Sequence, residues 1–309
     1  MNAPSAGIDL GGVLLPLTTP FDPVTGDVDV IALRANLRRW FEHPIRGVLI
    51  AGSTGESVFL DAEERRALLE AACDVMPADA LLLAGTGQES TRGTIRATRE
   101  AAEAGADAVL VKPPVYYRGA MTPEVLARHY RAVADASPVP VLVYQVPLRL
   151  STLEFPTGLV AELSRHPNIV GIKDSRGKLE GTAELVEQTA DDFQVLVGSG
   201  GALYGGLEVG AVGGIVAAGL LATAEAAGVY HAYRAGRHEE AGRLQQIVGP
   251  VHDGIVGGMG VPGIKAALDL LGLHGGAPRP PLAPLPDERV EEVRRILSAA
   301  GLLPAGAGV

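Results

Sequence analysis

The stretch NIVGIKDS (168–175) is a short apolar run of β-type residues that becomes polar at its C-terminal end. Seven other stretches of the chain share this form. They are GVLLPLTTP (12–20), GVLIAGSTGE (47–56), ALLLAGTG (80–87), AVLVKPP (108–114), VPVLVYQVP (139–147), FQVLVGSG (193–200) and AVGGIVAAG (211–219). Each run has the length of a strand buried on both faces.

Amphipathic patterns of helical period lie between these runs. They span residues 29–41, 61–75, 90–104, 122–136, 156–165, 178–190 and 201–210. Strands separated by helices predict a parallel sheet with right-handed crossovers, and eight such units close most naturally into a (β/α)8 TIM barrel, an α/β fold. A doubly wound sheet is the alternative, but it usually has fewer strands, and no G-x-G-x-x-G follows the first run.

The last part of the chain has no further strand signal. Helices are expected over 223–235, 237–253, 261–271 and 287–299, with a Pro-rich, extended connection over 275–286. We therefore expect residues 1–222 to form the barrel, and residues 223–309 to form the last barrel helix and a C-terminal helical extension. Among the helix starts, Asp61 with Glu64 and Thr122 before Pro123 have the residues of N-terminal caps.

Composition narrows the class of protein. The 309 residues are 47% hydrophobic and 20% charged, as in an ordinary globular protein, and the formal net charge of -10 argues against nucleic acid as a partner. Cys73 is the one cysteine, which excludes an internal disulfide and suits a reducing compartment; we expect it to be a small buried residue on a helix. The start of the chain lacks a signal-peptide pattern and no apolar run is long enough for a membrane span, so a cytoplasmic protein without a membrane partner is expected.

The barrel fold predicts where reactive side chains gather. Active sites of TIM barrels lie at the C-terminal ends of the strands. The side chains at these ends are Ser53, Thr54, Glu56, Lys112, Tyr144, Arg149, Lys173, Asp174 and Ser199.

Lys173 carries the chemical argument. The chain has four lysines among its 26 basic residues, so arginine supplies most of its positive charge. A lysine inside the apolar run IVGIK is costly to keep protonated, and a neutral amine is what a Schiff-base nucleophile needs. A buried ion pair with Asp174 is the structural alternative, and position alone leaves the two interpretations equal.

Other residues near these strand ends support a site without a metal. Tyr144 ends the neighbouring strand and can pass protons, although a barrel-filling aromatic residue is a reasonable alternative. The turn 52–55 (GSTG) offers N–H groups for a carboxylate, and Glu56 is expected to hydrogen-bond this turn. The seven histidines have no metal-ligand spacing and are interpreted as surface or packing residues.

Three motifs together resemble one family. GSTGE (52–56), YQVP (144–147) and GIKDS (171–175) are similar to motifs of the dihydrodipicolinate synthase/N-acetylneuraminate lyase family, and the resemblance covers nearly the whole chain. Within the family, LLLAGTGQEST (81–91) and DFQVLVGS (192–199) are most similar to 4-hydroxy-2-oxoglutarate aldolase. The family fold is the same (β/α)8 barrel.

The resemblance implies roles for individual residues. Lys173 matches the Schiff-base lysine and Tyr144 the tyrosine that moves protons beside it. Thr54 matches the hydroxyl that links Tyr144 to a second tyrosine, matched by Tyr116, which family tetramers donate across a subunit interface. The N–H groups of Ser53 and Thr54 would hold the pyruvate carboxylate, and the carbonyl of Ile215 would line the site.

Two departures and one match bear on the second substrate. Gln145 stands where Asn is common, and LRLST (148–152) replaces the usual turn after Pro147. Arg149 nevertheless matches the arginine with which synthases bind the carboxylate of the second substrate. Arg149 therefore favours a synthase function, whereas the longer local sequence matches favour an aldolase function.

The resemblance implies a carbon–carbon lyase that takes a 2-oxo acid and an aldehyde as small-molecule partners, without a metal or organic cofactor. Cleavage of 4-hydroxy-2-oxoglutarate to pyruvate and glyoxylate is the leading expectation. 4-Hydroxy-tetrahydrodipicolinate synthase, which joins pyruvate to aspartate semialdehyde, is the alternative, followed by a sugar-acid dehydratase. A sensor barrel that binds an oxo acid is the non-enzymatic alternative. Donation of Tyr116 would require a homotetramer or a dimer.

Overall fold

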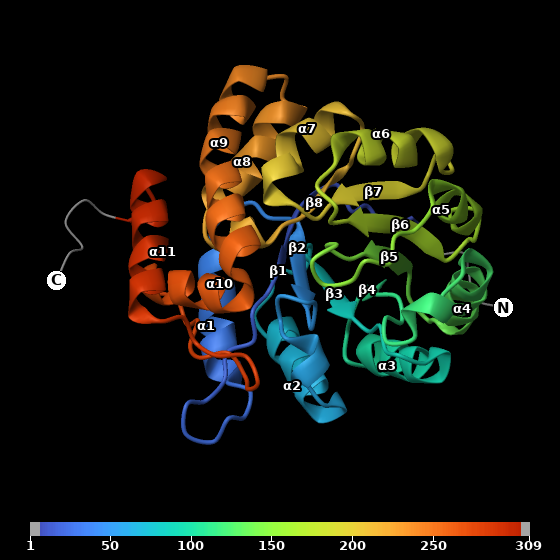
Figure 1. Cartoon of the computed structure of the whole chain (residues 1–309), viewed down its shortest axis with the longest axis horizontal. Helices are drawn as coiled ribbons and strands as arrows, with labels where there is room; N and C mark the ends of the chain where they lie inside the picture. The colour runs from blue at the N-terminus through green and yellow to red at the C-terminus, as the bar shows by residue number, and fades with distance from the viewer. Residues whose placement is uncertain (1–6, 304–309) are drawn as a thin grey trace.

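The computed structural model describes residues 7–303, and its eight strands form one closed parallel barrel in chain order (Figure 1). The strands are β1 (Gly12–Pro16), β2 (Gly47–Ile50), β3 (Leu81–Gly85), β4 (Ala108–Val111), β5 (Val141–Gln145), β6 (Ile169–Asp174), β7 (Gln194–Val197) and β8 (Gly213–Ile215). Each lies within one of the eight apolar runs. The predicted TIM barrel is confirmed.

Eight helices surround the ring of strands (Figure 1). They are α1 (Val30–Trp40), α2 (Ala62–Cys73), α3 (Thr91–Glu103), α4 (Pro123–Ala136), α5 (Thr157–Leu163), α6 (Leu179–Gln188), α7 (Leu203–Glu208) and α8 (Thr223–Arg234). The predicted caps are present: Asp61 and Glu64 form a reciprocal capping box on α2, and the Thr122 hydroxyl accepts a hydrogen bond from the Val125 N–H of α4.

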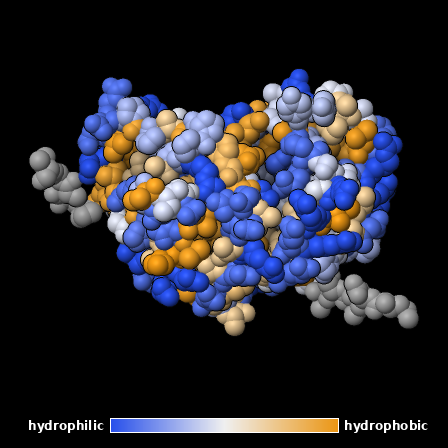
Figure 2. All heavy atoms as spheres, turned by 90° about the horizontal axis from the view of Figure 1, so that it is seen from below, coloured by the Kyte–Doolittle hydropathy of each residue, from blue (hydrophilic) through white to orange (hydrophobic). Residues whose placement is uncertain are grey.

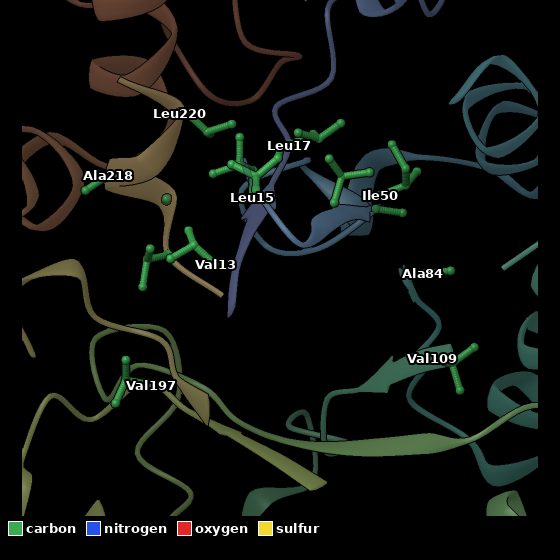
Figure 3. Close-up of a cluster of buried hydrophobic side chains, with 14 of the residues drawn as sticks. Val13, Leu15, Leu17, Ile50, Ala84, Val109, Val197, Ala218 and Leu220 are labelled. Atoms are coloured by element: carbon green, nitrogen blue, oxygen red, sulfur yellow. The ribbon is translucent and has the colours of Figure 1, made fainter. Parts of the chain in front are cut away.

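Strand alternation divides the apolar residues into two layers. Leu14, Leu142 and Leu196 belong to the cluster inside the barrel, where they pack around its axis. Val13 and Val197, next to them in sequence, point outward into the larger layer between strands and helices, part of which Figure 3 shows. The helices therefore cover the outer face while the interior is free to hold a chemically distinct set of side chains.

The chain after α8 forms four further helical segments. They are α9 (His238–Val251), the π-helical segment η5 (His252–Gly257), α10 (Gly258–Leu270) and α11 (Asp287–Ala299). Figure 1 shows α9 beside α8, and α10 beside α11. A helical C-terminal extension is thus present, while the division of the chain at residue 222 stays a prediction.

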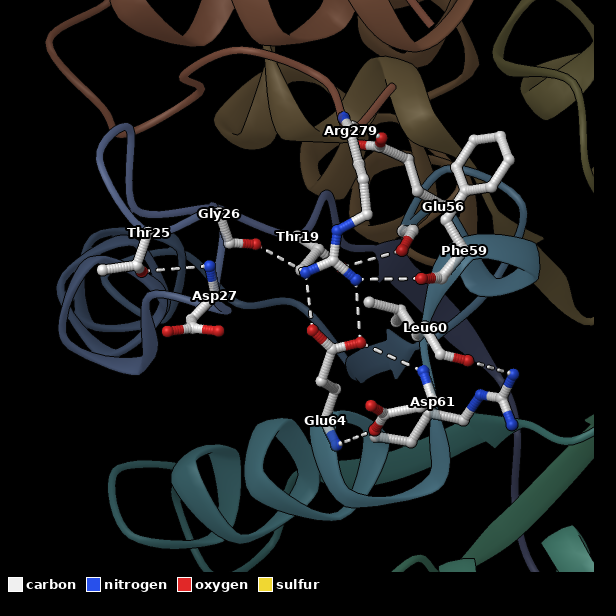
Figure 4. A network of polar contacts seen from close by, with 12 residues as sticks. Thr19, Thr25, Gly26, Asp27, Glu56, Phe59, Leu60, Asp61, Glu64 and Arg279 are labelled. Carbon is white, nitrogen blue, oxygen red and sulfur yellow. Dashed lines mark hydrogen bonds and ion pairs between the residues drawn. The ribbon is translucent and has the colours of Figure 1, made fainter. Parts of the chain in front are cut away.

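The Pro-rich segment 275–286 is fixed to the barrel through Arg279. Its guanidinium donates to both carboxylate oxygens of Glu64, at 2.8 and 2.5 Å, and to the carbonyls of Phe59 and Gly26 (Figure 4). The same guanidinium lies 4.2 Å from the centre of the Phe21 ring. Arg279 therefore joins the C-terminal extension to the loops after β1 and β2.

A buried ion pair lies beside Arg279 and corrects the expectation for Glu56. The Glu56 carboxylate was expected to hydrogen-bond its own turn. Instead, one of its oxygens lies 2.8 Å from Lys265 Nζ, and the other accepts a hydrogen bond of 2.7 Å from the backbone N–H of Arg279. Both charged side chains are almost fully buried, at 1% exposure or less. Glu56 is structural, as expected, but its partners come from the C-terminal extension and could not be read from local spacing.

Two surface features complete the description. Cys73 was expected to be buried, but it ends α2 and is exposed, because Leu69, Ala71 and Ala72 form the buried face of that last turn and Cys73 lies off this face. Within residues 7–303, no helix is both long and apolar enough to cross a membrane. The face seen in Figure 2 is largely hydrophilic, with smaller hydrophobic areas between the polar ones.

The buried pair between Glu56 and Lys265 generates a stability prediction. Lys265→Met removes the cation and leaves the Glu56 carboxylate buried without its counter-charge, so the free energy of unfolding should fall by about 3–5 kcal/mol. Arg66→Met is the matched control, since it breaks an exposed pair with Glu70 and should cost less than about 1 kcal/mol. Urea unfolding measures both. Equal losses in the two variants would contradict the role given to Lys265.

Candidate active site

Lys173 and Tyr144 lie side by side at the C-terminal ends of β6 and β5. The strand register pairs Tyr144 directly with Lys173, and the lysine Nζ lies 4.7 Å from the centre of the tyrosine ring. Both side chains are buried, at 5% and 4% exposure. Within residues 7–303, Lys173 Nζ has no hydrogen bond and no ion pair. Burial lowers the pKa of Lys173, while the charge of an ionised Tyr144 would oppose this shift.

The structural alternative for Lys173 was an ion pair with Asp174, and the structure does not contain it. Asp174 binds Arg176 instead, with both carboxylate oxygens within 3.1 Å of the guanidinium nitrogens. Successive residues of a strand point to opposite faces, so Lys173 and Asp174 are separated by β6 itself. The lysine amine is therefore left without a counter-ion in the barrel interior.

A cavity of about 310 Å³ opens above Lys173 at the C-terminal ends of the strands. Seven residues singled out from the sequence line it, and these are Lys173, Tyr144, Ser53, Thr54, Arg149, Ser199 and Ile215. Arg149 comes from the loop after β5, and the one hydrogen bond of its guanidinium within the described chain is to the Val256 carbonyl, at 3.2 Å. Its charge is therefore available to a ligand.

Glycine at position 198 creates space beside the lysine. A Cβ atom added to Gly198 would lie 1.8 Å from Ser175 Oγ and 3.0 Å from Lys173 Cε. No side chain fits at that point without displacing both residues. The sequence GSG (198–200) after β7 thus gives Lys173 and Ser175 access to the cavity.

The turn that carries Ser53 and Thr54 is held in an uncommon backbone conformation. Ala51 and Glu56, on either side of it, have positive φ angles of 52° and 56°, which residues other than glycine rarely adopt. The carbonyl of Gly55 accepts a hydrogen bond from the buried Thr19 hydroxyl at 2.8 Å. The ion pair of Glu56 with Lys265 supports the same turn, so the C-terminal extension helps to place it.

Tyr116 is not part of this cavity within one chain. Its side chain is 79% exposed and packs edge-on against Tyr117, with ring centres 5.0 Å apart. The Glu89 carboxylate accepts the N–H groups of Val115 and Tyr116 and binds Lys112 at 2.9 Å. No hydrogen bond links Thr54 to Tyr144 or to Tyr116 among the residues described.

The extension also supplies residues that the sequence did not single out. Val256 and Ile264 line the cavity together with His252, one of the seven histidines that the sequence assigns to the surface or to packing. Its ring nitrogens contact the Ser199 hydroxyl at 3.0 Å and the Gly200 N–H at 3.2 Å. The sequence signal was the Gly-rich stretch GPVHDGIVGGMG (249–260), where a π-helix forms; such bulges are frequent at functional sites.

The cavity carries basic but no acidic side chains among the described residues. Lys173, Arg149 and Arg176 line it, whereas no Asp or Glu does so among the described residues. The positive charge of Arg176 is balanced by Asp174, which leaves Arg149 as the cation that a carboxylate ligand can engage. No cluster of three or more His, Cys, Asp or Glu side chains suited to a metal is found within residues 7–303.

Comparison with known proteins places the chain in a family. The family model of the Dihydrodipicolinate synthetase family matches residues 9–300. A 4-hydroxy-tetrahydrodipicolinate synthase of Methanosphaerula palustris is 35% identical over 93% of this chain and 98% of its own length. A probable mitochondrial 4-hydroxy-2-oxoglutarate aldolase of Emericella nidulans is 36% identical over 90% of this chain and 91% of its own length.

Comparison with a solved structure indicates the same family as these two relatives. The dihydrodipicolinate synthase of Acinetobacter baumannii, crystallised with pyruvate, superposes with a TM-score of 0.90 at 28% identity, over 95% of this chain and 100% of that one. The resemblance found in the sequence is thereby confirmed. The chain belongs to the dihydrodipicolinate synthetase family, whose enzymes are carbon–carbon lyases that hold pyruvate as a Schiff base on a lysine.

Proposed function

We propose that the protein is a cytoplasmic aldolase that cleaves 4-hydroxy-2-oxoglutarate to pyruvate and glyoxylate, with Lys173 as the Schiff-base nucleophile. The observation that carries this proposal is the buried amine of Lys173, which lies beside Tyr144 with no counter-ion within the described chain. A lysine in this setting gives up its proton more readily than a solvated one, and only the neutral amine attacks a carbonyl.

The reaction follows from this arrangement. Neutral Lys173 attacks C2 of the oxo acid, and loss of water gives a protonated imine that accepts an electron pair. Removal of the proton from the 4-hydroxyl then breaks the C3–C4 bond, releasing glyoxylate and leaving the enamine of pyruvate on the lysine. Protonation of C3 and addition of water release pyruvate and restore the amine. Tyr144, next to Nζ, moves the protons.

The substrate carboxylates have two binding places in this proposal. The Ser53 and Thr54 N–H groups take the carboxylate next to C2, because their turn faces Lys173 across the cavity. Arg149 takes the carboxylate of the aldehyde, since its guanidinium has only a carbonyl as protein partner. Ile215 also lines the cavity.

The charge of the cavity supports glyoxylate over aspartate semialdehyde as the aldehyde partner. Both carry a carboxylate, but aspartate semialdehyde also carries an ammonium group at neutral pH. A buried cation needs an anionic or strongly polar partner, and no Asp or Glu lines the cavity among the described residues. The alternative function, 4-hydroxy-tetrahydrodipicolinate synthase, is supported by Arg149 and by the names of several relatives.

Tyr116 enters the proposal through a second copy of the chain. In its own chain this tyrosine is exposed and lies outside the cavity. We propose that a homotetramer, or at least a dimer, brings the tyrosine of one subunit to the Thr54 hydroxyl of the next. The carboxylate of Glu89 fixes the backbone at Val115 and Tyr116 and would hold the tyrosine in position for this contact.

The aldehyde preference can be measured directly. With pyruvate present, the enzyme should condense glyoxylate faster than aspartate semialdehyde, and it should cleave 4-hydroxy-2-oxoglutarate. Arg149→Met removes the cation that binds the carboxylate, so KM for glyoxylate should rise about tenfold to a hundredfold. Glycolaldehyde, which has no carboxylate, is the control, and its addition should be unaffected. Faster turnover of aspartate semialdehyde would transfer the assignment to the synthase.

Subunit mixing tests the role of Tyr116. Tyr116→Phe and Lys173→Ala should each abolish most activity alone. When the two variants are unfolded together and reassembled, some sites combine an intact lysine with a neighbour's intact tyrosine, so activity should reappear. Mixing Lys173→Ala with Tyr144→Phe is the control, because both residues belong to the cavity of one chain and no site regains the pair. Equal activity in the two mixtures would refute donation by a neighbour.

A further inference from the structure

A serine–histidine pair in the cavity has no part in the reaction described above. Ser199 follows β7, and His252 is the first residue of the π-helical segment η5. Both line the cavity, and Ser199 Oγ lies 3.0 Å from His252 Nε2. The other ring nitrogen, Nδ1, lies 3.2 Å from the backbone nitrogen of Gly200.

These contacts define the tautomer of His252. A backbone N–H can only donate, so Nδ1 must be unprotonated to accept from Gly200. The proton of the neutral ring is then on Nε2, which donates to Ser199 Oγ. Burial lowers the pKa of His252, and the charge of Arg149 acts in the same direction against the opposing charge of Asp253, so the ring is neutral near pH 7.

The consequence concerns the hydroxyl proton of Ser199. Its oxygen already accepts a hydrogen bond from His252 Nε2–H, so the serine cannot donate to that ring nitrogen. No other hydrogen bond of Ser199 Oγ occurs among the described residues. The hydroxyl is thus left with a proton to donate, and its side chain faces the cavity.

The position of Ser199 around the barrel indicates which part of the substrate it contacts. Its strand, β7, adjoins the strand of Lys173, while β8 and β1 separate it from β2 and the Ser53–Thr54 turn. When the carboxylate of a molecule bound to Lys173 is held at that turn, the rest of the molecule extends away from β2. Ser199 therefore lies on the side of the cavity where the aldehyde half of the substrate must be.

We propose that Ser199 donates a hydrogen bond to an oxygen of the acceptor aldehyde, and that His252 is a positioning residue that orients this hydroxyl. The inference rests on the proposed function, because it assumes a pyruvate imine on Lys173. It adds a second contact to the acceptor: Arg149 binds the carboxylate, and Ser199 binds a different oxygen. The C-terminal extension thereby takes part in selecting the aldehyde.

Three variants separate the parts of this arrangement. Ser199→Ala removes the donor. His252→Asn keeps an acceptor for the Gly200 N–H but loses the donor to Ser199, whereas His252→Gln places an amide N–H near the former Nε2. We expect kcat/KM for the acceptor aldehyde to fall about tenfold in Ser199→Ala and in His252→Asn, and less in His252→Gln. Adduct formation with pyruvate alone, trapped by borohydride, should be unchanged in all three.

The chain offers a matched control outside the cavity. Thr91 and His129 form the same kind of hydroxyl–imidazole bond, 2.9 Å long, between α3 and α4. Thr91→Val removes that bond and should change neither the aldehyde reaction nor pyruvate trapping. A comparable loss in this variant would mean that any such bond affects activity through stability, which would overturn the inference.

Two further results keep this inference distinct from the proposed function. The assays use glyoxylate and aspartate semialdehyde in parallel; if only the second is turned over, the proposed function fails while the Ser199 effect on it still supports the inference. Nitrogen-15 NMR of the ligand-free enzyme should show that His252 is protonated at Nε2 and unprotonated at Nδ1. Four results would overturn the inference. They are a proton on His252 Nδ1, an unchanged kcat/KM in Ser199→Ala, a loss of pyruvate trapping in Ser199→Ala as large as its loss of kcat/KM for the aldehyde, and turnover of neither aldehyde.

Discussion

Closing eight parallel strands into a barrel turns every second side chain toward a shared interior, and the site depends on this constraint. On β6 it directs Lys173 inward and Asp174 outward, so two neighbouring charges that could neutralise each other are kept apart. Arg176 satisfies the aspartate on the outer side. The lysine amine remains buried beside Tyr144 without a counter-ion within the described chain, and burial favours its neutral form.

The C-terminal extension acts on this site from two directions. Through Lys265 and Arg279 it holds Glu56, the residue that ends the Ser53–Thr54 turn. Through the π-helical segment it places His252 and Val256 over the cavity. The cavity itself carries arginine side chains although the whole chain has a formal net charge of -10, and this local charge suits a substrate with carboxylates.

Much of the fold and part of the site could be predicted, because they depend on local patterns. Each strand is a short apolar run, and the strand ends identified Lys173, Tyr144 and Arg149 as cavity residues. The contacts of Glu56, Arg279 and His252 join residues far apart in sequence, and no periodicity encodes such pairs. The prediction that Cys73 is buried was wrong, because Leu69, Ala71 and Ala72 form the buried face of the last turn of α2 and Cys73 lies off that face. The roles of the site residues stay predictions.

The account depends most on Lys173 as the residue that binds pyruvate covalently. Incubation with pyruvate, reduction with borohydride and peptide mapping by mass spectrometry would locate the adduct among the four lysines. The account predicts an adduct on Lys173 that requires pyruvate and disappears in Lys173→Ala. An adduct on Lys112 or Lys265, or no adduct at all, would contradict it.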